Sequence, residues 1–267
     1  MKRLRERRLW NGSASGDFRR SLRRPTMSCR REPTTPIADW GSHGRQANER
    51  SDAEVSMMKW VPKHLDRLFE ALLEHLYLVF SSVGIALVIS LIVGIWAARR
   101  PRSFAVIIIF TGILFAVPSL ALFALLIPIM GIGAAPAITG LAAYSLMILI
   151  RNIGMGFQAI PRDILEAADG MGYGTARRIW EVELPLAMPY IVGGIRIAMV
   201  TVIGIATVAA YINAGGLGVI IFEGIDQRFP EKIIAGGLLT SFLALFADYC
   251  FASFEKLLRR RSGGKAA

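Results

Sequence analysis

Cysteine and histidine are scarce in this sequence, and their scarcity excludes several kinds of site. The two cysteines, Cys29 and Cys250, lie far apart and predict neither a disulfide framework nor a metal site. The three histidines lack ligand spacing, and no nucleophile stands beside a base. No G-x-x-x-x-G-K-[ST] run occurs, so the chain lacks the usual loop that cradles ATP phosphates. We therefore expect a protein that is not an enzyme and that holds no cofactor or metal.

Charge is missing from one long stretch, since no residue from Ser103 to Ile150 is charged. A single helix of that length would be about 72 Å long, too long for one bilayer crossing. The stretch must fold back, and Met130–Gly133 is the natural turn. Pro118 should kink or interrupt its first half. Together with similar apolar runs elsewhere, this predicts an all-α, polytopic membrane protein with five transmembrane helices, over about 76–98, 104–128, 134–151, 190–212 and 233–254.

The distribution of Lys and Arg beside these spans predicts the orientation. Twelve of them flank the side that carries residues 99–102, the 152–188 loop with the adjacent Arg151, and the tail 256–267, and five flank the other side. Cytoplasmic loops carry the excess of positive charge. We expect the N-terminus outside, and the 152–188 loop and the basic tail in the cytoplasm.

Residues 1–56 form a basic N-terminal extension without a periodic apolar pattern. Its first 52 residues hold 13 of the 31 Lys and Arg residues against 6 acidic ones. Such a composition predicts disorder. We expect membrane lipid but no nucleic acid as a partner, because the charges show no regular interleaving with aromatic residues and no folded domain stands behind them. The extension would place its charges on the wrong side of the membrane, so we expect translation to begin at Met57 or Met58.

The segment 57–75 has apolar residues at helical spacing, with charged residues on much of the opposite face. This pattern is typical of an amphipathic helix in the outer membrane interface. The alternative is a first span that begins early.

The 152–188 loop predicts two short helices joined by a turn. Pro161 can open the first helix, and glycines at 170, 172 and 174 end it. Thr175 can cap a second helix, which Leu184-Pro185 then stops.

Within this loop, one pattern resembles the EAA loop of binding-protein-dependent importer permeases. It consists of Glu166-Ala167-Ala168, Gly172, Val182 and Leu184-Pro185, with Val182 where the family usually has Ile. The resemblance implies a fold like that of type I importer permeases over residues 76–255, in a bacterial inner membrane. It also implies that Glu166, Ala167, Ala168, Gly170, Gly172, Val182, Leu184 and Pro185 receive motion from a separate ATPase subunit.

The flanking stretches resemble permeases for osmoprotectants such as glycine betaine, choline and carnitine. They are residues 118–138, RNIG at 151–154, VELPLAMPYIVGGIRIA at 182–198 and AYINAGGLG at 210–218. The resemblance implies three partners: an ABC ATPase, a periplasmic or lipid-anchored solute-binding protein, and a second permease copy or paralogue. The alternatives are an importer of another small solute, such as methionine, and a subunit of an ATP-independent channel or carrier.

Two further features stand out in the last spans. Arg196 and Asp248 are ionisable residues inside spans, at similar depth from the cytoplasmic side, and such residues are paired or functional by default. We expect them to pair, the alternative being that each side chain snorkels to the membrane edge. Ala214, Gly215, Gly216 and Gly218 lie at the outer end of the fourth span. We interpret them as part of an outer gate or of the contact with the binding protein, the alternative being a flexible loop.

Overall fold

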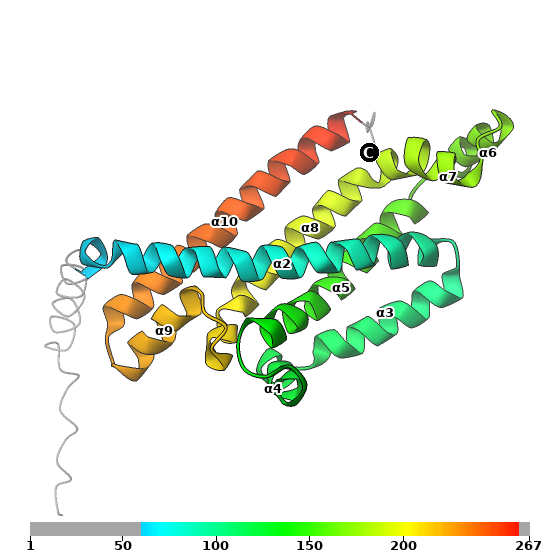
Figure 1. Cartoon of the computed structure of the whole chain (residues 1–267). Coiled ribbons are helices and arrows are strands. Elements are labelled where there is room, and N and C mark those ends of the chain that lie inside the picture. The colour runs from blue at the N-terminus through cyan, green and yellow to red at the C-terminus, as the bar shows by residue number, and fades with distance from the viewer. Residues whose placement is uncertain (1–59, 262–267) are drawn as a thin grey trace, which may run out of the picture. The chain divides into compact units, whose positions relative to one another are not determined.

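The computed structural model describes residues 60–261, and every regular element in that range is helical (Figure 1). Four helical stretches of this part of the chain are long and apolar enough to cross a membrane, and a bent pair of shorter helices would make a fifth. The predicted all-α membrane fold is therefore confirmed. The four stretches are 65–98, 134–158, 175–206 and 230–260.

The first long helix, α2 (Leu65–Ala98), is continuous. Residues 65–75 of the expected interfacial segment belong to this helix, and their place in the membrane interface stays a prediction. Leu68 and Ala71 are buried in one cluster with Leu217 and Ile220 of α9 (Leu217–Asp226). The apolar stripe thus meets another helix of the same chain. Residues 1–56 and the proposed start at Met57 or Met58 lie outside the described residues.

The expected span over 104–128 consists of two helices, α3 (Pro101–Ala116) and α4 (Ser119–Met130), which meet at 95°. The break predicted at Pro118 is confirmed, but it is a sharp corner and not a kink. Val117 is extended, as a residue before proline prefers. Its carbonyl accepts a hydrogen bond from the Tyr144 hydroxyl. At about 24 Å, α3 alone is shorter than the hydrocarbon core.

The remaining spans differ from expectation mainly at their ends. α5 (Ala134–Gln158) continues seven residues beyond the expected end at 151. α8 (Leu184–Ala206) begins before 190 and gives way to a 3-10 helix, η2 (Val208–Ile212). α10 (Pro230–Arg261) covers 233–254 and includes the first half of the expected tail.

The core forms where α2 lies across α5 and α8, while α10 packs on α8 and α9. Its largest cluster includes Leu78 and Val79 of α2, Leu141 of α5, and Val202 and Ile203 of α8. Large apolar side chains remain exposed on α3 and α10, among them Phe110, Ile113, Phe242, Leu245 and Phe246. A face of that kind suits lipid or another membrane helix.

The close approach of α9 to the end of α8 supplies a test of this packing. A Cβ atom at Gly218 would lie 2.0 Å from the carbonyl oxygen of Thr207, and a backbone atom cannot turn away. At Gly204, on α8, a Cβ atom would meet nothing within 4 Å. We expect Gly218→Ala to lower the free energy of unfolding by about 1–3 kcal/mol. Gly204→Ala, the control, should be neutral or stabilise by up to about 1 kcal/mol. Thermal unfolding midpoints in detergent measure both, and equal midpoints would contradict the packing described.

Candidate functional site

Between α5 and α8 the chain makes a short helical excursion that begins with α6 (Arg162–Gly170). This helix ends in a Schellman motif, in which a residue of positive φ closes the last turn. Gly172 has a φ of 79° and donates its N–H to the Asp169 carbonyl at 2.9 Å. Tyr173 donates to the Ala168 carbonyl at 3.1 Å. Glycine adopts this φ without strain, so the chain reverses sharply at this point.

The second helix of the excursion, α7 (Thr175–Arg178), runs into α8 without a break. The residues between them, η1 (Ile179–Glu183), form a π-helical turn, in which the Leu184 N–H bonds the carbonyl of Ile179. The expected stop at Leu184-Pro185 is therefore wrong. Pro185 has no N–H, and its ring would meet the carbonyl four residues earlier in a regular α-helix. The wider π turn relieves this conflict and lets the helix continue.

The structure places the residues of the EAA-like pattern in two environments. Glu166 and Ala167 are exposed on α6, and Glu166 forms no hydrogen bond or ion pair with the described residues, whereas Ala168 is buried. Gly170 is the last residue of α6. Val182 and Leu184 are half-buried, with Leu184 packed on the cluster that includes Ile153, and Pro185 is exposed.

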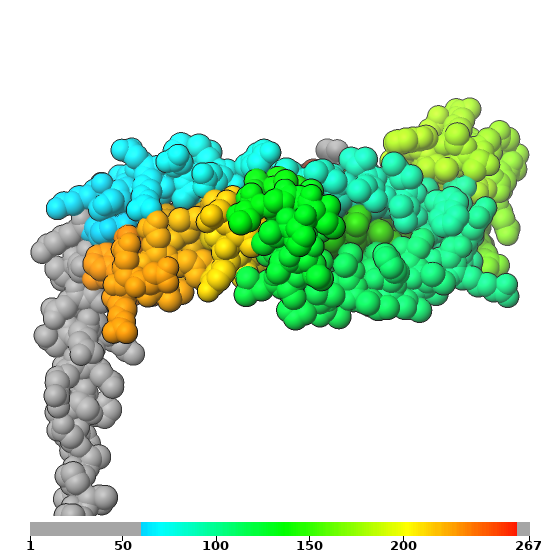
Figure 2. Space-filling model, turned by 60° about the horizontal axis from the view of Figure 1, so that its bottom comes forward, coloured from blue at the N-terminus to red at the C-terminus, as the bar shows by residue number. Residues whose placement is uncertain are grey.

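Two large apolar side chains that the sequence reasoning missed are exposed on the same excursion. Met171 is 67% exposed and Trp180 is 71% exposed. In Figure 2 the α6–α7 segment, in yellow-green, projects beyond the ends of α2 and α3. Exposed apolar side chains near a free carboxylate are typical of a surface that binds another protein. Spacing alone could not identify them, because a tryptophan in a helix is usually a core residue.

A chain of ion pairs connects this excursion to the end of α2. The Glu183 side chain is only 7% exposed, and its carboxylate accepts hydrogen bonds from Arg99 at 3.0 and 3.1 Å and from Arg178 at 2.9 Å. Arg178 also binds Asp169 of α6, at 2.5 and 2.6 Å. A buried carboxylate needs such partners, because an unpaired charge there is costly. Sequence reasoning missed this chain of contacts, since it had used Arg99 only to count charge.

The two intramembrane charges lie in contact. Arg196 on α8 donates from Nε and Nη2 to the two carboxylate oxygens of Asp248 on α10, at 2.6 and 2.9 Å. Glu255, which the sequence did not single out, lies 3.6 Å from the Arg196 guanidinium and also pairs with Arg259. The bidentate geometry fixes both the register and the rotation of α8 against α10.

The glycine-rich turn between η2 and α9 is packed against α2. Gly215 and Gly216 have φ values of 85° and 86°, and Ala214 and Gly215 are half-buried while Gly216 and Gly218 are buried. Glu74 of α2 accepts the Gly216 N–H at 2.8 Å. This carboxylate lies at the N-terminus of α9, where negative charge is favourable. The structure thus has a turn that packs and hydrogen-bonds against α2 at this point.

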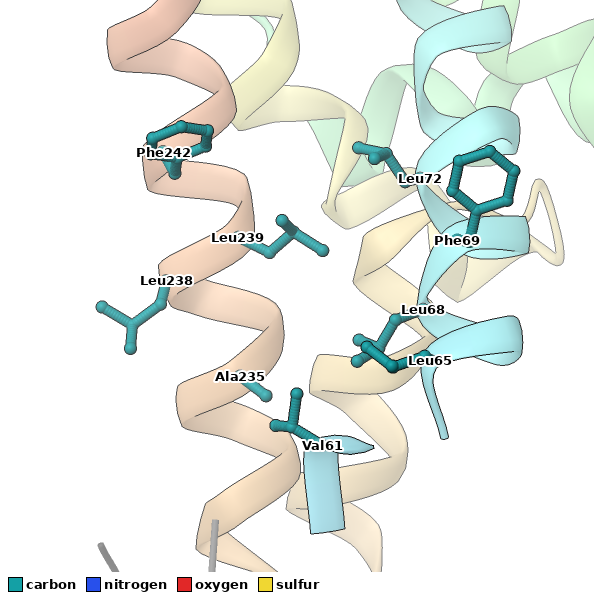
Figure 3. Close-up of a pocket in the computed structure, with 9 residues that line it drawn as sticks. All are labelled: Val61, Leu65, Leu68, Phe69, Leu72, Ala235, Leu238, Leu239 and Phe242. Atoms are coloured by element: carbon teal, nitrogen blue, oxygen red, sulfur yellow. The ribbon is translucent and has the colours of Figure 1, made fainter. Parts of the chain in front are cut away.

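An apolar groove between the first turns of α2 and the first half of α10 has a volume of about 460 Å³ (Figure 3). All the side chains that line it are hydrocarbon, so it offers no charge or hydrogen bond to a polar solute. It suits an acyl chain or an apolar helix better than a transported molecule. Its lining residues are Val61, Leu65, Leu68, Phe69, Leu72, Ala235, Leu238, Leu239 and Phe242.

Comparison with known proteins gives consistent matches. The family model of binding-protein-dependent transport system inner membrane components matches residues 90–261. A glycine betaine/carnitine/choline transport system permease of Bacillus subtilis is 37% identical over 183 residues, covering 68% of this chain and 84% of that protein. An osmoprotectant import permease of Salmonella typhimurium is 36% identical, covering 69% and 88%. The inward-facing MetNI methionine ABC transporter has a similar fold, with a TM-score of 0.64 and 22% identity, covering 73% of this chain and 98% of that one.

The contact of α8 with α10 can be tested by exchanging its charges. Either Arg196→Asp or Asp248→Arg leaves like charges together between α8 and α10 and should lower the thermal midpoint of the protein in detergent. The double exchange restores the pair but places the new carboxylate beside Glu255. We therefore expect full recovery of the thermal midpoint only when Glu255→Gln is added. No recovery in either combination would show that the pair does not hold α8 and α10 together.

Proposed function

Because the chain belongs to the family of binding-protein-dependent transport system inner membrane components, it is the membrane permease subunit of an ATP-binding-cassette importer, and we propose that it transports a small quaternary-ammonium osmoprotectant. The Bacillus subtilis relative is named for the transport of glycine betaine, carnitine and choline, which share a trimethylammonium group, and the Salmonella relative is named for osmoprotectant import. The likeness to the methionine transporter concerns the fold and favours no substrate. An importer of an amino acid such as methionine stays the alternative.

The exposed surface of the α6–α7 excursion supports the proposal that an ATPase subunit binds there. Met171 and Trp180 supply apolar area, and Glu166 is free to pair with a cation of the partner. The α7 helix continues into α8, so a displacement of the excursion would also move a membrane helix. This is the observation that carries the coupling role, because a free loop would absorb such a displacement.

The exposed faces of α3 and α10 support a second permease chain beside this one. One chain with four or five spans encloses little space, so a pair is the smallest sensible unit for a pathway. On the charge distribution, the α6–α7 excursion and the C-terminus face the cytoplasm, and the N-terminus faces outward. A solute-binding protein would then dock near the turn at Gly215 and Gly216.

One experiment tests the substrate and the energy source together. The chain, purified from its source in mild detergent, should bring an ATPase and a solute-binding protein with it. In proteoliposomes, the complex should take up labelled glycine betaine, choline or carnitine only when ATP is present. Uptake of methionine alone would show that the substrate is an amino acid. Uptake without ATP would refute the proposal of an ATP-driven importer.

A charge reversal at Glu166 tests the docking surface. Glu166→Lys should weaken ATPase binding and ATP-driven uptake by about tenfold or more, as expected when a central interface contact is lost. Glu70→Lys is the matched control, because Glu70 is an exposed glutamate near the other end of α2. It should leave ATPase binding unchanged. The ATPase retained on the tagged permease measures both, and equal retention by the two variants would remove Glu166 from the interface.

A further inference from the structure

We propose that α2 is a rigid connecting helix that carries the ATP-driven displacement of the α6–α7 excursion to the glycine-rich turn at the opposite end of the bundle. Arg99 at one end, and Glu74 with His75 at the other, are the positioning residues. The inference rests on the proposed function, because it assumes that an ATPase moves the excursion. It goes beyond that function in naming the element that transmits the movement.

At the excursion, the attachment of α2 is electrostatic and shielded from water. Arg99, the residue that caps α2, binds both oxygens of the nearly buried Glu183. Glu183 also holds Arg178 of α7, which reaches Asp169 of α6. Separating Arg99 from Glu183 would leave the shielded carboxylate without one of its two cations, which is costly. The excursion and the end of α2 are therefore expected to move together.

At the opposite end, α2 holds the backbone where α8 changes into η2. In a regular helix the Ile203 carbonyl would accept the Thr207 N–H, but Thr207 donates to Gly204 at 3.4 Å. The fully buried His75 ring places Nε2 3.1 Å from the Ile203 oxygen, so it donates the missing hydrogen bond. A buried carbonyl without a donor would be unfavourable, so this contact is expected to persist.

The next residue along α2 fixes the other side of the same irregular segment. Glu74 accepts the Gly216 N–H at the start of α9, and Arg67, about two turns earlier, pairs with Glu223 of α9. Glu74 and His75 thus bracket residues 203–216. Any shift of α2 along its axis would pull on both ends of that segment.

Between these attachments α2 has no break that could absorb a displacement. It contains no proline and runs as one helix, so Glu74 and Arg99 are about 38 Å apart along its axis. Its buried face packs along α5 and α8, with Leu78, Val79 and Ala86 in the core clusters. A straight packed helix has few ways to deform over that distance, and energetic coupling can travel through such an element.

The test measures the outer segment while the ATPase works. Tyr211, 68% exposed in η2, is replaced by cysteine in a background that carries Cys29→Ser and Cys250→Ser. The permease, its ATPase and its binding protein are reconstituted with glycine betaine, and the rate of maleimide labelling is compared with and without ATP and vanadate. In this background, ATP should change the labelling rate by about tenfold, the size of a typical coupling between sites.

Arg99→Gln and Glu74→Gln should abolish this change while ATP hydrolysis continues, so that solute uptake per ATP falls about tenfold. Arg102→Gln is the matched control, because Arg102 is exposed at the start of α3 and forms no ion pair with the described residues. It should behave like the background. Where Arg99→Gln does not assemble, Arg99→Lys keeps the charge without the guanidinium fork and should reduce the response.

An undiminished response in the Arg99 and Glu74 variants would overturn the role of α2. ATP-driven uptake without any labelling change at position 211 would do the same and would leave the importer assignment intact. A background complex that shows no ATP-driven uptake would instead refute the proposed function, and with it this inference.

Discussion

Backbone groups cannot remain unpaired in apolar surroundings, and this constraint determines where the helices of this bundle can be interrupted. At each of three irregular points, a side chain from another helix makes a hydrogen bond with a backbone group that has no partner within its own helix. Two of these side chains come from α2 and one from α5, the helices at the centre of the packing. The pairs are Tyr144 with Val117, His75 with Ile203, and Glu74 with Gly216.

The charged residues obey a related rule. Glu183, which is nearly buried, is paired with two arginines, and Arg196 is paired with Asp248. The pairs Arg99–Glu183 and Arg196–Asp248 each join helical segments that are distant in the sequence. Glu166 differs, since it is exposed and has no ion pair among the described residues. An unpaired carboxylate in water has little energetic cost, so Glu166 remains available to pair with a cation of a partner protein.

Much of this architecture could be predicted from the sequence because membrane burial leaves simple signals. The uncharged stretch 103–150 predicted two crossings and a turn, and Pro118 predicted the break between α3 and α4. Gly172 predicted the sharp reversal after α6. Each of these signals is local: the length of an uncharged stretch, the missing N–H of a proline, and the positive φ that a glycine allows.

The features that were missed depend on contacts between distant residues. The apolar stripe before residue 76 packs on α9, which lies more than a hundred residues later, and spacing alone could not show that partner. The partners of Glu183 and the hydrogen bond of His75 likewise have no signature in spacing. Pro185 was misread for a different reason, since a proline stops a regular helix and the sequence gives no sign of a π turn.

The π turn before α8 has a consequence for how this chain tolerates change in length. A π turn contains one residue more than the α-helical turn it replaces, so a continuous helix can accommodate a one-residue insertion in this form. Losing that residue would rotate everything that follows by about 100° relative to the excursion. Pro185 would then again meet the carbonyl four residues earlier. The rotation of the α6–α7 excursion relative to α8 therefore depends on a single additional residue in η1.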